Sequence, residues 1–259
     1  MRVAVVGATG RIGRLTVVAL ERRGHETVGI SRTQGVDVHT GEGLVMALTG
    51  VDAVVDACSC SATDRDEAVA FFTSSTRNLL EAERQTGVQH HVLLSIAGAT
   101  RVTGNAHYAG KRAQEELVER GPVPWSIVPA THFHDFAEMV TTWTERDGSA
   151  TIAPLLVQPV APADVADVLA EVAIGEPQGR CPDLAGPEPQ DLVDLARRTR
   201  AARGTSIRLV PTWSGVFGLD MAGDVLLAGP NARIAPTTFD EWLAGRDALV
   251  IGSSACRQA

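Results

Sequence analysis

The feature that most constrains this chain is a glycine-rich segment close to its start. Residues 2–6 form a short, valine-rich run that is typical of a buried parallel strand, and the segment GATGRIG at residues 7–13 follows at once. Apolar side chains then recur at helical spacing at Ile12, Leu15 and Val18. A G-x-x-G-x-x-G segment between a strand and a helix is typical of a β–α unit that binds a dinucleotide.

Each glycine of this segment has a separate physical reason. Gly7 permits a tight turn, Gly10 allows the backbone to approach a pyrophosphate, and Gly13 lets the helix pack close to the strand. The N–H groups at the start of the helix and the positive end of its dipole favour phosphate oxygens. The segment therefore predicts a dinucleotide cofactor.

The end of the second predicted strand, at residues 28–30, indicates which dinucleotide is bound. Sites that prefer NAD(H) usually carry an acidic residue here, which binds the ribose 2′-hydroxyl. This chain has Ser31 and Arg32 instead, and Arg11 lies in the glycine segment. A hydroxyl and two guanidinium groups suit a 2′-phosphate, so we expect NADP(H) as the cofactor.

Strand and helix patterns alternate through the first half of the chain. After the glycine segment and its helix, strands are predicted at residues 28–30, 35–38, 53–57, 91–95 and 125–128, and helices at residues 42–48, 64–85 and 107–120. This alternation predicts right-handed βαβ units and an α/β fold of the Rossmann type, with a doubly wound parallel sheet.

The sequence changes in character after Pro129, where prolines and glycines become frequent. Helices are predicted at residues 162–174, 190–202 and 237–244, short strands at residues 183–185 and 207–210, and a frayed tail after Gly252. We expect residues 1–129 to form an NADP-binding Rossmann domain. Residues 130–259 should form mainly a small C-terminal substrate-binding subdomain, with helix 162–174 packing back on the Rossmann domain.

The composition of the chain limits its partners. Its 259 residues carry a net charge of −8, which argues against a nucleic-acid-binding surface. The N-terminus lacks the pattern of a signal peptide, and no apolar stretch approaches the ~20 residues that span a bilayer. We therefore expect a cytoplasmic monomer or homodimer that binds a small-molecule substrate and has neither nucleic-acid nor membrane partners.

Two groups of potential metal ligands are present. Cys58 and Cys60 form a C-x-C pair with no further ligands at a useful spacing, so we interpret them as reduced, buried or half-buried thiols. His132, His134 and Asp135 lie close together in sequence, but their spacing fits no closed metal site. We expect no bound metal, and we interpret these three residues as pocket lining or loop hydrogen-bonding groups.

Lys111 is the only lysine among the 23 basic residues of the chain. An arginine differs from a lysine in shape and donor geometry, so a single remaining lysine suggests a site that requires a compact ammonium group. His107 lies four residues before Lys111 and Tyr108, the only tyrosine, lies three residues before it. Both positions neighbour Lys111 on one helix face.

At these residues the chain resembles the short-chain dehydrogenase/reductase superfamily. The resemblance is carried by GATGRIG at residues 7–13, by Ser31-Arg32, by Ser95 at a strand end and by Lys111. Later segments are similar to the atypical, NmrA-like branch of the superfamily. These segments are PWSIVPATHFHDF at residues 124–136, PADVAD at residues 162–167 and LAGPE at residues 184–188, and the resemblance covers roughly residues 1–245.

The resemblance implies an NADP(H) site on a Rossmann domain. It includes Ser95 and the strand-end residues from Asp56 to Ser59, and it places Asp37 near the adenine. The cofactor-binding residues that we expect are Gly7, Thr9, Gly10, Arg11, Ile12, Gly13, Ser31, Arg32, Asp37, Ala57, Cys58, Lys111, Pro129, Ala130 and Thr131. The candidate catalytic residues are Lys111, His107, Tyr108, Ser95 and His132.

Three positions depart from the family pattern. Typical members carry Y-x-x-x-K, in which the tyrosine protonates the substrate and the lysine lowers its pKa and holds the nicotinamide ribose. Here His107 occupies the tyrosine register and Tyr108 stands beside it. Either donates a proton, Tyr108 with a pKa lowered by the neighbouring ammonium, or neither does and Lys111 only anchors the ribose. Pro129 and His132 replace an arginine and a glutamine that are frequent in the branch.

Three functions fit these observations. The first is an NADPH-dependent oxidoreductase that reduces a carbonyl, an enone or a quinone of a small organic substrate. The second is a non-catalytic NADP sensor that binds a protein partner, as in some NmrA-like regulators. The third is a biosynthetic enzyme that uses the Rossmann scaffold for a non-redox step, with His107, Tyr108 and His132 as acid and base.

Overall fold

The structure of the chain is a computed structural model, and it describes residues 1–245. Within them the chain divides into two compact units. The first unit comprises Met1–Ala130 and Pro162–Asp183, and the second comprises Thr131–Ala161 and the residues from Leu184 onward. The tail predicted to fray after Gly252 lies outside the described residues.

The first unit contains a parallel sheet with the strand order β5-β4-β3-β1-β2. Its strands are β1 (Arg2–Val6), β2 (Glu26–Ile30), β3 (Ala53–Asp56), β4 (His90–Ile96) and β5 (Trp125–Ala130). The short strand β9 (Gly179–Arg180) adds to β5 in the parallel sense. The chain winds outward in opposite directions from β1 and β3, so the topological switch point lies between the carboxyl ends of these two strands.

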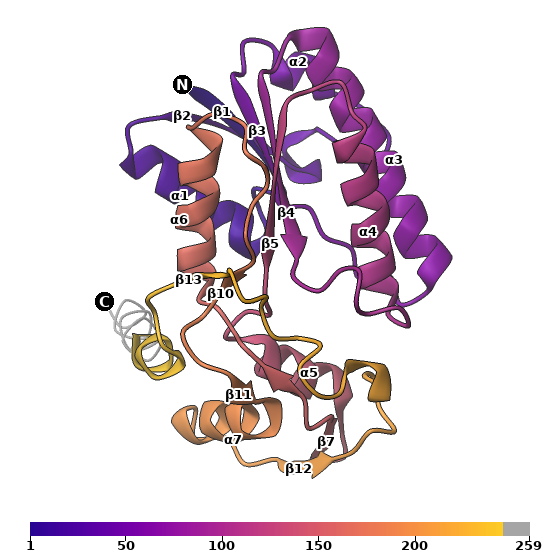
Figure 1. Cartoon of the computed structure of the whole chain (residues 1–259), viewed down its shortest axis with the longest axis vertical. Coiled ribbons are helices and arrows are strands. Elements are labelled where there is room, and N and C mark those ends of the chain that lie inside the picture. Colours follow the sequence, from indigo (N-terminus) through magenta and orange to yellow (C-terminus); the bar gives the residue numbers. More distant parts are fainter. Residues whose placement is uncertain (246–259) are drawn as a thin grey trace, which may run out of the picture. The chain divides into compact units, whose positions relative to one another are not determined.

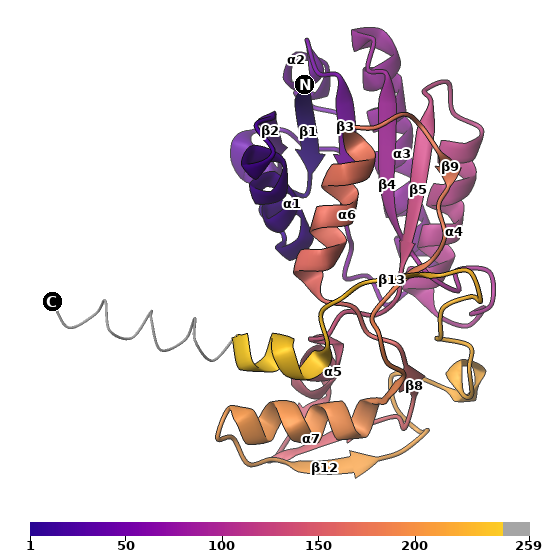
Figure 2. The same cartoon turned by 60° about the vertical axis from the view of Figure 1, so that its left-hand side comes forward.

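Helices cover both faces of this sheet (Figures 1 and 2). On one face lie α1 (Arg11–Arg22) and α6 (Pro162–Ala173). Arg22 and Arg23, at the end of α1, form ion pairs with Asp167 of α6, each at 2.9 Å. The other face is covered by α2 (Leu44–Leu48), α3 (Arg65–Thr86) and α4 (Ala106–Glu119). The expected doubly wound Rossmann fold is therefore confirmed.

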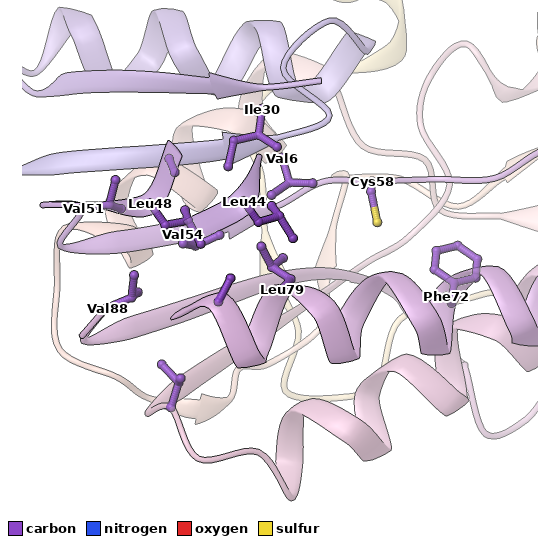
Figure 3. Close-up of a cluster of buried hydrophobic side chains, with 13 residues drawn as sticks. Val6, Ile30, Leu44, Leu48, Val51, Val54, Cys58, Phe72, Leu79 and Val88 are labelled. Carbon is purple, nitrogen blue, oxygen red and sulfur yellow. The ribbon is translucent and has the colours of Figure 1, made fainter. Parts of the chain in front are cut away.

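A buried hydrophobic cluster lies between the sheet and its α2–α3 face (Figure 3). It includes Val6 and Val54 from the strands, Leu44 from α2, and Phe72 and Leu79 from α3. Strands β1 and β3 are almost completely buried and are continuous apolar runs, which is why the sequence pattern identified them. This core fixes the strand ends at which the candidate site is built.

The second unit is built from shorter elements. Its helices are α5 (Phe136–Thr144) and α7 (Leu192–Ala202), and residues 239–245 are also helical. Its strands are β6 (Glu145–Arg146), β7 (Ser149–Ile152), β8 (Leu156–Val157), β10 (Leu184–Ala185), β11 (Gln190–Asp191), β12 (Arg208–Pro211) and β13 (Arg233–Ile234). β7 pairs with β6 and β12, β8 pairs with β11, and β10 pairs with β13.

The structure corrects the sequence analysis at several places. The strand predicted at residues 35–38 is wrong, because this segment is a turn closed by an isolated bridge between Asp37 and Glu42. Gly35, Gly41 and Gly43 adopt positive φ angles around it, and such angles do not continue a strand. The sequence analysis also missed α5 and the β6–β7 hairpin.

None of the helices among residues 1–245 combines the length and the apolar character that a transmembrane helix needs.

Candidate functional site

The glycine turn after β1 is closed by backbone contacts. The Gly7 amide donates to the Ile30 carbonyl at 3.0 Å, and Gly7 has a φ of +75°, a conformation that favours glycine. A Cβ added at Gly13 would lie 2.1 Å from the Gly7 oxygen. Such overlap excludes any side chain at Gly13, so α1 packs directly against the turn.

The N-terminus of α1 is open and carries no acidic residue. Gly10 occupies the N-cap position but has no side chain that could accept from the amides of the first turn. Thr9, Gly10 and Arg11 are exposed. The neighbouring Ile12 is buried and anchors the turn in the core. The positive end of the helix dipole disfavours the arginines that begin α1, unless an anion accompanies them.

Three other helices have the opposite kind of N-terminus. Asp64 caps α3 by accepting from two backbone amides, Asn105 caps α4 in the same way, and Asp191 caps α7. These carboxylate and amide oxygens satisfy donors that a helix start otherwise leaves unpaired. The start of α1 lacks such an oxygen and is suited to an anionic ligand.

The end of β2 places a hydroxyl and a guanidinium group beside the turn. Ser31 precedes a short 3₁₀ turn, η1 (Arg32–Gln34), without capping its amides, and its Oγ bonds to the Thr33 Oγ1 at 3.0 Å and to the Gln34 Oε1 at 2.9 Å. Arg32 is exposed, and no carboxylate of residues 1–245 pairs with it. Its guanidinium group can therefore take an external anion.

Asp37, which the resemblance places near the adenine, lies in the loop after η1. Its Oδ1 accepts the His39 amide at 2.8 Å, and its backbone pairs with Glu42. In this structure the carboxylate stabilises its own loop. Contact with an adenine remains a prediction.

The end of β3 faces the glycine turn. A Cβ on Gly7 would meet the Ala57 oxygen at 3.0 Å, so these two backbone segments lie close together. The Cys58 amide donates to the Asp56 Oδ1 at 2.9 Å. Cys58 itself is buried, as Figure 3 shows, and burial raises the pKa of its thiol well above the usual value. The thiol is therefore a neutral packing group.

The single lysine points into the protein interior. Lys111 is 4% exposed, and its Nζ donates to the Leu94 carbonyl at 2.9 Å and to the Gln114 Oε1 at 2.8 Å. The same ammonium group lies 4.8 Å from the centroid of the Phe72 ring. Lys111 is thus held by α3, α4 and β4 within the first unit.

The two candidate proton donors beside Lys111 are poor acids in this structure. Burial raises the pKa of Tyr108, so the expected lowering by a neighbouring ammonium is wrong. Burial, followed by repulsion from Lys111, lowers the pKa of His107 to about 4, so this imidazole is neutral at pH 7. Ser95 and Tyr108 are buried, and their hydroxyl oxygens have no hydrogen-bond partner among residues 1–245.

The last predicted site residues lie at and after the end of β5. Pro129 and Ala130 are buried in the first unit, where Pro129 pairs in register with Ser95. Thr131 belongs to the second unit, where its Oγ1 donates to the Gln158 carbonyl at 2.5 Å. The ring of His132 is tilted against Phe136 with their centroids 4.1 Å apart.

His134 and its neighbours form an aromatic cluster in the second unit. The His134 ring lies 5.5 Å from Phe239 and 5.4 Å from Trp242, and its Nε2 bonds to the Thr237 carbonyl at 3.1 Å. This arrangement uses His134 for packing. Residues 1–245 contain no group of three potential ligands that would hold a metal ion.

The sequence analysis did not single out Gln114. This fully buried residue bonds at once to Lys111 and to the Asp56 carboxylate, 2.8 Å from each. Its spacing of three residues from Lys111 was the available signal, because such residues share a helix face. Polarity at a core position was the second signal.

The first unit fits a dinucleotide at the carboxyl ends of β1, β2 and β3. The glycine turn excludes a Cβ at Gly13, α1 starts without a side-chain cap, and Arg32 offers a positive charge. These features can hold phosphate oxygens, and the switch point lies beside them.

Two curated relatives are similar in sequence to parts of this chain. An uncharacterized protein of Mycobacterium tuberculosis is 28% identical over 183 residues, which are 66% of this chain and 18% of the relative. The photosystem II assembly factor Ycf39 of Synechocystis is 32% identical over 147 residues, which are 51% of this chain and 45% of that protein. The chain therefore spans less than half the length of either relative.

Two solved structures share the fold over nearly the whole chain. A short-chain dehydrogenase/reductase superfamily protein of Agrobacterium tumefaciens with bound NAD has a TM-score of 0.72 at 19% identity, covering 100% of this chain and 99% of that one. An NADPH-dependent quinone oxidoreductase of Escherichia coli has a TM-score of 0.67 at 15% identity, covering 95% and 99%.

The two solved structures show that the chain shares its fold with NAD(P)-dependent proteins of known structure. The model of a protein family described as NAD(P)H-binding matches residues 34–174, which is more than half of the 259 residues. The chain belongs to this NAD(P)H-binding family.

Proposed function

We propose that this protein is an NADPH-dependent oxidoreductase that reduces a quinone or a similarly activated carbonyl or enone. The observation that carries the cofactor assignment is the uncapped start of α1 behind a turn that admits no Cβ. Gly10, which has no side chain, would let the pyrophosphate approach, and Thr9, Arg11 and the positive end of the α1 dipole would hold it. Ser31 and Arg32 would bind the 2′-phosphate, which favours NADPH over NADH.

The substrate class follows from the poor acids on α4. The bound cofactor supplies a hydride, and reduction of a carbonyl also consumes one proton. Tyr108 is buried with a raised pKa, and His107 is neutral at pH 7, so neither side chain is a good proton donor here. A quinone accepts hydride to give a stabilised aryloxide, which takes its proton from water, whereas a ketone gives a strongly basic alkoxide. The similar fold of an E. coli quinone oxidoreductase supports this choice.

The test is the consumption of NADPH with a matched panel of quinones, enones and ketones. We expect quinones to be reduced at least about a hundredfold faster than unactivated ketones, since general acid catalysis contributes about that much or more. Equal rates with ketones would contradict the substrate class. Tight NADPH binding without turnover of any compound would contradict the enzymatic function.

A second candidate is a non-catalytic NADP sensor. It is favoured by the burial of Lys111, Tyr108 and Ser95, none of which is more than 4% exposed. The similarity to a photosystem II assembly factor agrees with a role in binding another protein. A sensor would bind NADP+ and NADPH without hydride transfer, and an affinity capture would recover one partner only in the presence of the dinucleotide.

A further inference from the structure

Three buried polar residues of the first unit form a continuous chain of hydrogen bonds. Lys111 is 4% exposed, Gln114 is 0% exposed and Asp56 is 1% exposed. Lys111 comes from α4, one turn before Gln114, and Asp56 ends β3. Charged groups are rarely buried at such depth without a specific partner.

The Gln114 amide joins the two charges. Its Oε1 accepts from the Lys111 Nζ at 2.8 Å, and its Nε2 donates to the Asp56 Oδ2 at 2.8 Å. Only a side chain that both accepts and donates can fill this place, because an ammonium group has no acceptor and a carboxylate has no donor. The amide is therefore matched to both neighbours in a way that no apolar residue reproduces.

Both ends of this chain are fixed to backbone. At one end, the Lys111 Nζ donates to the Leu94 carbonyl in β4 at 2.9 Å. At the other end, the Asp56 Oδ1 accepts the Cys58 amide at 2.9 Å, which holds the segment that follows β3. The relay thus connects the interior of β4 with the backbone at the end of β3.

The backbone that the relay holds borders the glycine turn. A Cβ added to Gly7 would lie 3.0 Å from the Ala57 carbonyl oxygen, so these two backbone segments are close together. A shift of Ala57 or Cys58 would therefore alter the space in which Gly7 turns. Binding of a dinucleotide in one defined pose depends on such backbone positions, because a displacement of about 1 Å is felt in affinity or rate.

We propose that Gln114 and Asp56 are positioning residues for the NAD(P)H site, with Lys111 as the buried anchor of their relay. In this arrangement the only lysine influences the cofactor through Gln114, Asp56 and the Ala57–Cys58 backbone. The inference rests on the proposed dinucleotide site and adds two residues that act on it from the interior.

The test compares Gln114→Met with a control that loses buried hydrogen bonds elsewhere in the same unit. Gln114→Met keeps an unbranched side chain of similar size and removes both bonds of the relay. Ser126→Ala is the control, because the buried Ser126 Oγ bonds to the His90 Nε2 and to the Gln178 amide, each at 2.9 Å, near the amino end of β5. Both variants should melt at a lower temperature than the wild type.

The two variants should differ in NADPH affinity and in the hydrogen-exchange rate of the Cys58 amide. We expect Gln114→Met to weaken NADPH binding about tenfold and to speed hydrogen exchange of the Cys58 amide in the cofactor-free protein. Ser126→Ala should leave both within about twofold of the wild type. Equal changes in the two variants, or an unchanged Cys58 amide in Gln114→Met, would overturn the inference.

Gln114→Glu adds a second measurement, the pH dependence of NADPH affinity, which a purely structural role of Gln114 would leave unchanged. The introduced carboxylate still accepts from Lys111 but cannot donate to Asp56, and it regains a donor when it is protonated. NADPH affinity of this variant should therefore recover about tenfold as the pH falls from 8 to 6, relative to the wild type. A pH dependence parallel to the wild type would contradict the relay.

Failure of the proposed function can be recognised separately. If the wild type does not bind NADPH, the proposed function is wrong, and exchange of the Cys58 amide in cofactor-free Gln114→Met still decides whether the relay holds this backbone. If the wild type binds NADPH and Gln114→Met behaves like Ser126→Ala, the relay is wrong and the proposed function stands.

Discussion

Two regions of the first unit differ in whether their polar groups are exposed or buried. Around the glycine turn, α1 starts without a side-chain cap, and the side chain of Arg32 is exposed. Around α4, the polar ends of Lys111, Tyr108 and Ser95 are buried. The first region is suited to an external anion, and the second satisfies its charge internally.

This difference shows how backbone-built and side-chain-built sites follow from sequence. A glycine turn requires only backbone geometry, so its presence in the sequence determines what it offers a ligand. A Y-x-x-x-K pattern requires that side chains also point toward the cofactor, and spacing does not determine exposure. The predictions below test the contrast, from the largest expected effect to the smallest.

Gly13→Ala should nearly abolish NADPH binding. The added Cβ would lie 2.1 Å from the Gly7 oxygen, so either the turn or α1 must move. We expect an affinity loss of about a hundredfold or more, with lower stability. Titration of NADPH into folded protein checks this. Gly175→Ala is the matched control, because its Cβ would meet the nearest oxygen at an ordinary 3.6 Å, and it should bind normally.

Arg32→Gln should weaken NADPH binding while NADH binding stays unchanged. A charge-assisted contact with phosphate contributes about 1.5–3 kcal/mol, which corresponds to roughly ten- to a hundredfold in affinity. Arg120→Gln is the control, since the Arg120 side chain is 80% exposed at the end of α4. An equal loss for NADH and NADPH would show that Arg32 does not bind the 2′-phosphate.

Tyr108→Phe should change the rate of quinone reduction by less than about threefold, because the variant removes a hydroxyl that has a raised pKa and is a poor acid. The rate should also be flat between about pH 6 and pH 9, since His107, with a pKa of about 4, does not titrate there. The Tyr108 hydroxyl is buried without a partner among residues 1–245, so the variant should be as stable as the wild type or slightly more so. A rate loss of a hundredfold would identify Tyr108 as the acid.

His90 should make the protein sensitive to acid. Burial lowers the pKa of His90 from 6.5 to about 4, so the folded state binds this proton less readily than the unfolded state does. Its contribution to stability is present above pH 6.5 and is lost as the pH falls toward 4. We expect His90→Gln to remove about 1–2 kcal/mol of this acid destabilisation, a few degrees in melting temperature. The control His39→Gln, on an exposed loop, should leave the acid destabilisation unchanged.

The sequence predicted the parallel sheet of the first unit because four of its strands, β1, β3, β4 and β5, are almost completely buried. It missed α5, whose Val140, Thr141 and Thr142 are β-branched and weak helix formers, so that burial of one face decides the helix. It also missed the β6–β7 hairpin, although Asp147-Gly148 is a strong hairpin signal, with φ angles of 49° and 72°.

The sequence also predicted only part of the candidate site. The glycine turn and the end of β2 followed from local sequence, because each depends on a few adjacent residues. The inward direction of Lys111 did not follow from its spacing, because it depends on Leu94, Gln114 and Phe72, which come from three different elements. Contacts between distant segments of this kind appear only in the folded chain.

Calorimetric titration of the purified protein with NADPH, and in parallel with NADH, tests the central claim most directly. Backbone amides at the start of α1 and the Arg32 guanidinium predict one saturable NADPH site per chain, with an affinity at least about tenfold higher than for NADH. Absence of binding to either dinucleotide would contradict the account.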